Sequence, residues 1–100
     1  MRAAADEIVA ITSGLSLGSF LASKPLRWSI ERGFEIIGEA LTQLRKIDAP
    51  TAEQITGFRK IISFRNILIH GYSGIDDDNT WDIVQRNLPL LRRELAELLR

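Results

Sequence analysis

One apolar stripe constrains the fold of this sequence more than any other feature. Apolar residues follow Pro25 at spacings of 4, 4, 3, 4 and 3: Leu26, Ile30, Phe34, Ile37, Leu41 and Leu44. This spacing places all of them on one side of an α-helix, which turns by about 100° per residue. No stretch of the chain alternates apolar and polar residues as a half-buried strand does. The sequence therefore predicts an all-α fold built around one long helix.

Two short helices are expected before the stripe. Residues 3–12 have a helical pattern, and Ser13-Gly14 suits a helix end. Ser16 can cap a second helix over residues 16–23, because its oxygen can accept a hydrogen bond from a free amide of the first turn.

Two glycines interrupt the long helix of the stripe. Gly33 and Gly38 each weaken an isolated helix by about 1 kcal/mol relative to alanine. A close approach of another helix would compensate for this cost. We therefore expect such a contact on this helix.

Two further helices are expected after the break at Asp48-Ala49-Pro50. The first starts at Thr51-Ala52-Glu53-Gln54, which fits a capping box, and continues to Gly71 with apolar residues on more than one side. The last follows a loop over residues 73–79, and Pro89 is expected to kink it because proline has no amide hydrogen. Its apolar residues have helical spacing: Trp81, Val84, Leu88, Leu91, Leu95 and Leu98.

The length of the chain predicts one domain over residues 1–100. The helical patterns described above predict that this domain is a bundle of four to five helices. A domain of this size buries about 60 to 65% of the surface that its unfolded chain exposes. Because 45% of the residues are apolar, so small a core leaves an apolar face uncovered. Such a face favours pairing with a second copy, and we expect a homodimer.

Charge argues against a broad nucleic-acid-binding surface. Thirteen basic residues balance thirteen acidic ones, so any RNA binding must come from a local patch or from the geometry of a dimer. Residues 57–75 contain three basic residues, Arg59, Lys60 and Arg65, and no acidic residue. Arg59 and Lys60 are therefore candidates for RNA binding, although they could equally be solvated surface charges.

Several classes of protein are disfavoured by what the sequence lacks. Without cysteine there is no disulfide, thiolate nucleophile or cysteine zinc site. Residues 1–12 do not resemble a signal peptide, and the longest apolar runs are too short to span a bilayer. The expected protein is soluble and cytoplasmic, and it does not bind a membrane.

Two groups of acids could suggest a metal site. Glu31, Glu35 and Glu39 fit a solvated row on the long helix better than a set of ligands. Asp76-Asp77-Asp78 lacks the spaced acids, central glycine and closing glutamate of a calcium loop, and acids before a helix need no ion. We therefore predict no metal and no cofactor.

The residues best suited to chemistry lie near the end of the fourth expected helix. His70 is the only histidine, and a single histidine is often structural, but its neighbours include Arg65, Asn66 and Tyr72. On a continuous helix Asn66 and His70 share a face, whereas Arg65 and His70 lie about 140° apart. Gly71 could release His70 and Tyr72 from helical geometry, so that the four polar groups gather at the helix end.

This grouping suits RNA cleavage by internal attack, in which the 2′-hydroxyl displaces the 5′-oxygen at phosphorus. Histidine moves protons near neutral pH, and arginine can stabilise charge on the phosphate through paired donors. Asn66 could orient the imidazole or a phosphate oxygen. One imidazole cannot easily act as base and acid in the same turnover, but a two-fold dimer would bring two copies of His70 and Arg65 to one cleft.

These residues resemble a known family. Arg65-Asn66-x3-His70 fits the R-x4-6-H signature of the HEPN superfamily, and Arg65-x4-His70-x-Tyr72 is similar to its HepT-like toxin branch. The likeness also includes several other segments: Phe34-Glu35-Ile36-Ile37-Gly38-Glu39-Ala40, Gly74-Ile75-Asp76, Trp81 and Leu88-Pro89.

The resemblance implies an up-and-down helical-bundle homodimer that acts as the ribonuclease toxin of a type II toxin-antitoxin pair. It implies catalytic roles for Arg65 and His70 and a supporting role for Asn66. It also implies a minimal nucleotidyltransferase antitoxin that transfers AMP to Tyr72, where added bulk and negative charge would compete with RNA phosphate.

Three other interpretations remain open at the level of sequence. The chain could be a non-catalytic module that binds a nucleotide or presents a substrate to a nucleotidyltransferase, or it could be the neutralising member of the pair. It could also be a helical oligomerisation domain with Arg65 and His70 satisfied in an interface. This last option requires nearby acids, and the fourth expected helix offers only Glu53.

Overall fold

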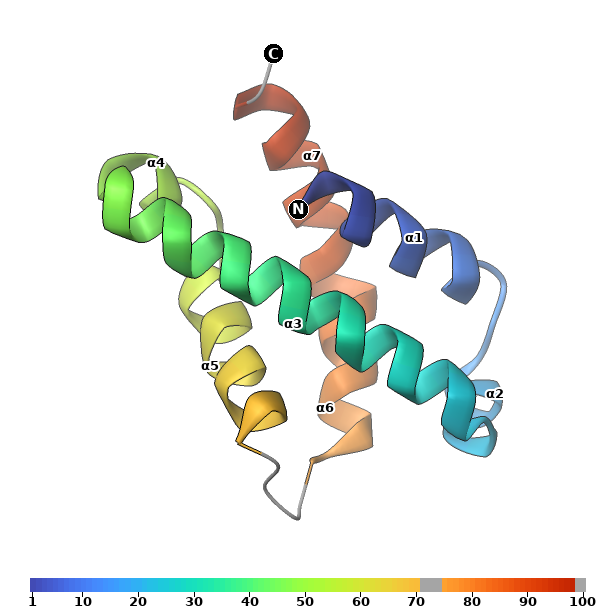
Figure 1. The fold of residues 1–100 in the computed structure, drawn as a ribbon. Helices are drawn as coiled ribbons and strands as arrows, with labels where there is room; N and C mark the ends of the chain where they lie inside the picture. The colour runs from blue at the N-terminus through green and yellow to red at the C-terminus, as the bar shows by residue number, and fades with distance from the viewer. Residues whose placement is uncertain (71–74, 99–100) are drawn as a thin grey trace.

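The protein is described by a computed structural model that covers residues 1–70 and 75–98. In these residues it contains helices and no strand (Figure 1). The elements are α1 (Arg2–Thr12), α2 (Leu17–Ala22), α3 (Lys24–Ile47), α4 (Ala49–Glu53), α5 (Phe58–Ile69), α6 (Asp77–Asp82), the π-helical turn η1 (Ile83–Asn87) and α7 (Leu88–Leu98). Because α6, η1 and α7 follow one another without a break, the described residues form six helices, against the four to five predicted.

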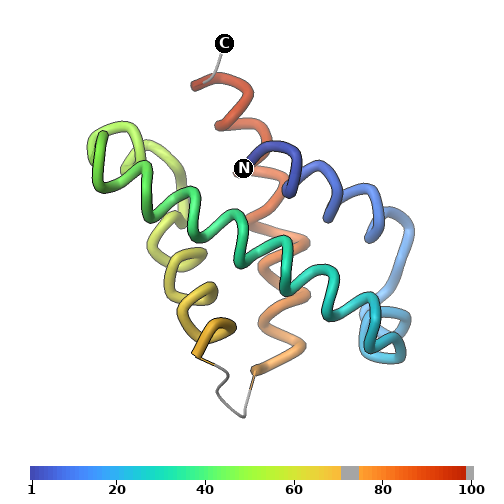
Figure 2. The backbone as a smooth tube through the Cα atoms, in the orientation of Figure 1, coloured from blue at the N-terminus to red at the C-terminus, as the bar shows by residue number. Residues whose placement is uncertain are grey.

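Helix α3 is the centre of the architecture. It packs against α5 on one side and α1 on the other, while α1 also contacts α7 (Figure 1). The chain path brings the end of α5 and the start of α6 to the same end of the molecule (Figure 2). His70, which follows α5, therefore lies at one end of the molecule.

The predicted apolar stripes form the core. On α3 the middle four members of the stripe are at most 1% exposed, and Leu26 and Leu44 are partly buried against the same cluster. Val84, Leu88, Leu91 and Leu95 are buried in the last helix, as their spacing predicted. The all-α prediction and the two main stripes are confirmed.

Helix boundaries agree with the sequence at the start of the chain. The Ser16 hydroxyl accepts a hydrogen bond from the amide of Ser19 (3.2 Å), so it caps α2 as expected. Gly14 has a φ of +76°, which a helix cannot continue, and α1 ends at Thr12.

The prediction of one continuous fourth helix that starts at Thr51 is wrong, because the structure has two helices there, α4 and α5. Asp48, rather than Thr51, caps α4, because its carboxylate accepts from the amide of Thr51 at 3.3 Å. Helix α4 then ends at Glu53, and α5 begins only after Gly57, whose left-handed φ of +75° breaks the helical path. A strong cap upstream and a glycine downstream thus override the capping-box pattern.

Helix α5 buries only one of its sides, although its apolar residues occur on more than one. Five of its apolar side chains enter the core: Phe58, Ile61, Ile62, Phe64 and Leu68. Ile67 and Ile69 are instead 38% and 44% exposed. The helix therefore has one inner face and an outer face that carries both polar and apolar residues.

The last helix continues through Pro89. The amide of Leu88 bonds to the carbonyl of Ile83, five residues back, so the helix widens by one residue in the turn before the proline. A widened turn changes which carbonyl faces the proline ring, which lacks an amide hydrogen. The sequence predicted a kink at Pro89, and the structure has a π-helical turn over Ile83–Asn87 just before this proline.

Gly38 allows α3 and α5 to approach closely, as its position in the helix led us to expect. A β-carbon at Gly38 would collide with the β- and γ-carbons of Arg65. These atoms lie near the α5 backbone and cannot move far without moving the helix. Gly38 therefore sets the distance between the helices and the position of the Arg65 stem.

A test of this contact is Gly38→Ala. We expect it to lower the free energy of unfolding by about 1–3 kcal/mol, because the helices must separate to accommodate the methyl group. Urea denaturation followed by circular dichroism measures the change. Gly18→Ala is the matched control, since its β-carbon would meet only the Ser16 hydroxyl at 3.6 Å. It should keep the stability of the wild type or raise it by up to about 1 kcal/mol, because alanine favours a helix over glycine. Equal stability of the two variants would show that the contact is not tight.

Candidate active site at the end of α5

Arg65 lies where α5 crosses α3. Its side chain is 20% exposed, with the stem against Gly38 and the guanidinium directed to the surface. One terminal nitrogen, Nη2, donates to Oε2 of Glu39, and the other, Nη1, donates to Oδ1 of Asn66 at 3.1 Å. The third nitrogen, Nε, is buried and has no hydrogen-bond partner among the described residues. The guanidinium is therefore held at both of its ends.

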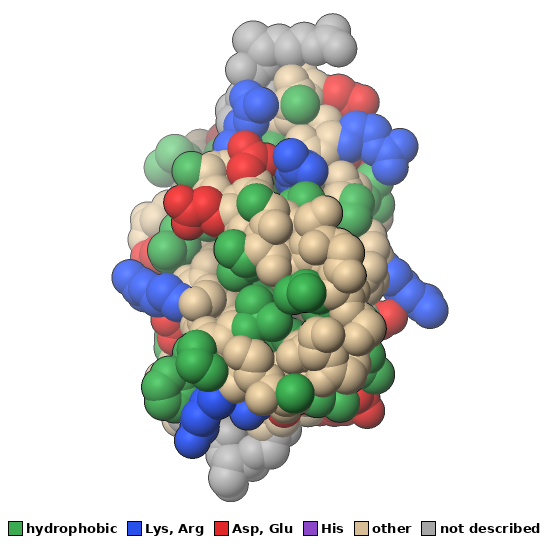
Figure 3. Space-filling model, turned by 90° about the vertical axis from the view of Figure 1, so that its right-hand side faces the viewer, with side chains coloured by type: hydrophobic (Ala, Val, Ile, Leu, Met, Phe, Trp, Pro, Cys, Tyr) green, Lys and Arg blue, Asp and Glu red, His purple; other side chains and the backbone are tan. Residues whose placement is uncertain are grey.

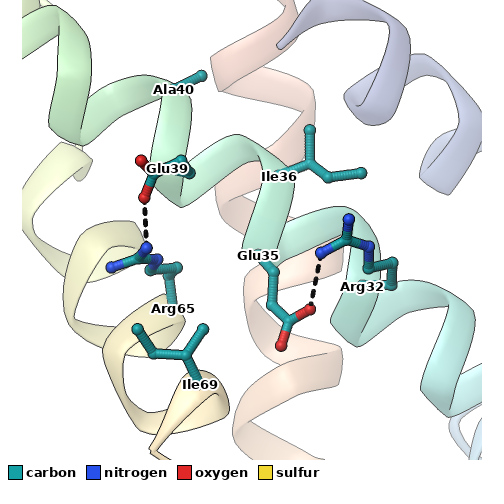
Figure 4. A pocket seen from close by; sticks show the side chains of 7 residues that line it. All are labelled: Arg32, Glu35, Ile36, Glu39, Ala40, Arg65 and Ile69. Carbon is teal, nitrogen blue, oxygen red and sulfur yellow. Dashed lines mark hydrogen bonds and ion pairs between the residues drawn. The ribbon is translucent and has the colours of Figure 1, made fainter.

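An open depression of about 460 Å³ lies beside Arg65 (Figure 4). Its lining combines two arginine–glutamate pairs with three apolar side chains: Arg32, Glu35, Ile36, Glu39, Ala40, Arg65 and Ile69. Arg32 pairs with Glu35 at 3.3 Å, and Arg65 pairs with Glu39. The lining residues therefore carry no net charge.

His70 follows the last residue of α5. Its backbone is still helical (φ −83°, ψ −3°), and its amide donates to the carbonyl of Asn66 at 3.2 Å. The expected release from helical geometry thus does not occur at His70 itself. The side chain is exposed and does not line the depression beside Arg65. Five residues of helix separate Arg65 from His70 by about 140° and about 7.5 Å along the axis.

The other residues of the predicted cluster are placed differently. Asn66 is exposed and contacts Arg65 directly, so these two are brought together as expected. Tyr72 lies outside the described residues.

Basic residues of α5 have acidic neighbours that the linear sequence did not reveal. Lys60 pairs with Asp82 at 3.8 Å, and Arg59 lies over the ring of Phe58 at 5.1 Å. On the opposite side of the molecule, shown in Figure 3, basic side chains are likewise scattered among acidic and apolar ones. The segment lacks acids in sequence, but the fold supplies them from other helices to Lys60 and Arg65.

The glutamates of α3 are not the simple solvated row that we predicted. Glu35 and Glu39 each pair with an arginine. Burial raises the pKa of Glu31, and the nearby charge of Asp77 adds to this effect. A hydrogen bond from Gln43 and the charge of Arg65 lower the pKa of Glu39, so this carboxylate is ionised at neutral pH. Within residues 1–70 and 75–98, no group of three metal-ligating side chains is found.

Sequence reasoning missed Glu39 as part of the site. The expected helix around Arg65 offers only Glu53 as an acid, whereas the acid that pairs with Arg65 lies on α3, 26 residues earlier in the chain. The only local signal was Gly38, whose cost in a helix predicted a close helix contact one residue before Glu39.

This all-helical chain is similar in sequence to proteins that are named as ribonucleases. A protein of Methanocaldococcus jannaschii named "Putative RNase" is 32% identical over 93 residues, covering 91% of this chain and 83% of the relative. A "Probable ribonuclease HepT" of Thermococcus cleftensis is 28% identical over 95 residues, covering 95% and 86%. No solved structure matches the chain with statistical significance.

The family described as ribonuclease HepT-like matches residues 1–98. The chain belongs to the HepT-like ribonuclease family, within the HEPN group to which its motif pointed. None of the described helices is sufficiently long and apolar to cross a membrane.

Proposed function

We propose that this chain is a metal-independent endoribonuclease that acts as a homodimer. The observation that carries the proposal is the match to the HepT-like ribonuclease family over residues 1–98, which includes the helix end with Arg65 and His70. Arg65 lies at an open depression with two donors still available, and His70 is exposed.

The reaction that suits these side chains needs no further group in principle. The 2′-hydroxyl loses its proton to a base, its oxygen bonds to phosphorus, and the bond from phosphorus to the 5′-oxygen breaks. The leaving oxygen takes a proton from an acid, so the products are a 2′,3′-cyclic phosphate and a 5′-hydroxyl. Imidazole is suited to both proton transfers, and the Arg65 guanidinium is suited to the charge on the phosphate oxygens.

Two copies complete this site better than one. The helix directs Arg65 and His70 of one chain to different sides, and a single imidazole would have to act as both base and acid. Two exposed apolar residues line the depression, Ile36 at 42% and Ile69 at 44%, and Ile67 on α5 is 38% exposed. Such residues favour burial against a second copy, which would bring another His70 to the cleft.

The test is cleavage of single-stranded RNA by the purified protein with excess EDTA. We expect cleavage to persist, because neither proton transfer nor charge stabilisation depends on a metal, and the products to end in 2′,3′-cyclic phosphate. RNA with a 2′-deoxy sugar at the cut site should resist cleavage. Activity that disappears with EDTA and returns with a divalent cation would contradict the proposed chemistry.

The biological role we propose is that of the toxin in a type II toxin-antitoxin pair. A cognate minimal nucleotidyltransferase would neutralise it by transferring AMP from ATP to the Tyr72 oxygen with release of pyrophosphate. Expression of the chain alone should arrest growth, and co-expression of the partner should restore it. Mass spectrometry should find adenylate on Tyr72 and none on Tyr72→Phe. Growth unaffected by the chain alone would favour the neutralising role instead.

A second candidate function is a non-catalytic module that binds a nucleotide or presents a substrate to a nucleotidyltransferase. It is favoured by the balanced charge around the depression, where each arginine already faces a glutamate. The RNA assay separates the two functions. Nucleotide binding without cleavage would support the module.

A further inference from the structure

Glu39 and its neighbours form a chain of hydrogen bonds across two helices. Gln43 donates from Nε2 to Oε1 of Glu39 at 3.0 Å, one turn away on α3. The other oxygen of the same carboxylate accepts from Nη2 of Arg65 on α5. Arg65 in turn donates from Nη1 to Asn66 at 3.1 Å. Both oxygens of Glu39 are thus engaged, one by each helix (Figure 4 shows the Glu39–Arg65 contact).

The rest of Arg65 is fixed by packing. Its stem passes against Gly38, where even a β-carbon would not fit, and its Nε is buried. The part of the side chain that packing does not fix is therefore the pair of terminal nitrogens, Nη1 and Nη2. The contacts that hold these nitrogens are those to Glu39 and Asn66.

A count of donors shows what remains for a substrate. A guanidinium has five N–H groups, one on Nε and two on each terminal nitrogen. Two are used by Glu39 and Asn66, and the one on buried Nε cannot reach solvent. One N–H therefore remains on each terminal nitrogen, which is the number that a phosphate uses in a paired contact. By the number of donors alone, the contact with Glu39 and a paired contact with phosphate are compatible.

We infer that Glu39, held by Gln43, is a positioning residue that orients the Arg65 guanidinium toward the phosphate of the RNA substrate. It acts through Arg65 and does not itself touch the reacting atoms. This inference rests on the proposed ribonuclease function for the identity of the phosphate. The pKa of Glu39 is lowered by the Gln43 hydrogen bond and the charge of Arg65, so the same contacts that hold the carboxylate also favour its charged form.

The test compares Glu39→Ala and Glu39→Gln with the wild type. We expect Glu39→Ala to lower kcat about 10- to 100-fold with little change in KM, because a guanidinium that swings no longer meets the phosphate in the transition state. Glu39→Gln keeps the shape and one oxygen acceptor, so its kcat should lie between the two. Gln43→Ala should shift kcat in the same direction by a smaller factor.

A charge-matched control separates positioning from net charge. Glu53→Ala removes the same charge from the end of α4, outside the depression, and should keep the kcat and KM of the wild type. Thermal unfolding by circular dichroism shows which variants are folded at the assay temperature, and activities are compared per folded molecule.

A direct measurement of Arg65 does not depend on catalysis. NMR should resolve the Nη–H signals of Arg65 in the wild type, because rotation of a guanidinium held at both ends is slow. These signals should broaden or merge in Glu39→Ala, and Arg65→Lys assigns them by their absence. If the wild type fails to cleave RNA, the ribonuclease proposal fails while this measurement still decides whether Glu39 holds Arg65.

Three results would overturn the inference. A Glu39→Ala variant with unchanged kcat and a lower KM would mean that Glu39 competes with phosphate for Arg65. A loss of activity fully explained by the unfolded fraction would mean that Glu39 is only structural. Identical Arg65 signals in wild type and Glu39→Ala would mean that Asn66 and packing hold the guanidinium without Glu39.

Discussion

Arg65→Ala is expected to lower kcat for RNA cleavage about 10²- to 10³-fold while the helical fold is retained. The guanidinium lines the depression and keeps N–H donors beyond those used by Glu39 and Asn66, and loss of a single charge-stabilising donor in an active site has an effect of this size. Single-turnover cleavage with enzyme in excess measures the chemical step directly. Circular dichroism checks that the variant is folded.

Arg65→Lys is the sharper form of the same experiment. A lysine ammonium is compact and lacks the planar fork that meets Glu39 and Asn66 while leaving two donors for phosphate. We therefore expect lysine to recover little of the lost activity, although it keeps the charge. Full rescue by lysine would mean that charge alone matters at this position and that the fork does not.

The matched control for Arg65 is Arg86→Ala. Arg86 is an exposed arginine that pairs with Asp82, four residues earlier in the chain. Neither residue lines the depression. Its removal changes the net charge by the same amount and should leave cleavage unchanged, because an exposed ion pair contributes little. Similar losses in both variants would show that the assay reports overall charge rather than a site.

The sequence predicts the main helices because the residues that a helix buries are apolar and recur every three to four positions. The α3 stripe and the last helix follow this period over many turns, and both form the core. Boundaries are predicted only where one signal dominates, as at Ser16. Between α4 and α5 the capping box competed with Asp48 and Gly57, and the actual break depends on the left-handed backbone of a glycine that sequence alone did not single out.

The site is predictable only in its local part. Arg65 and Asn66 are adjacent in sequence and do touch in the structure. Glu39 could not be assigned to Arg65, because its side chain lies in a row of glutamates with helical spacing and its partner is 26 residues away. Which glutamate meets Arg65 is decided by the register in which α3 packs on α5, and that register depends on Gly38.

His70→Ala is expected to lower kcat about 10²- to 10⁴-fold, the range typical for loss of a group that transfers protons. His70 is exposed at the end of α5, so its removal should have little effect on the stability of the core. The measurement is single-turnover cleavage of the same RNA, with thermal unfolding as the check on folding. His70→Gln keeps hydrogen bonding without proton transfer and should be as inactive as His70→Ala.

Mixing His70→Ala with wild-type chains tests whether two copies share one cleft. After equal amounts of the two chains exchange at random, about one quarter of the dimers hold two wild-type chains and about half hold one. If both imidazoles are needed at one phosphodiester, activity per total chain should fall to about one quarter of that of the undiluted wild type. The reason is that one histidine would act as base while the other acts as acid. Activity of about one half would mean that each protomer cleaves RNA with its own His70, and a shared cleft would then be wrong even if the protein is a dimer.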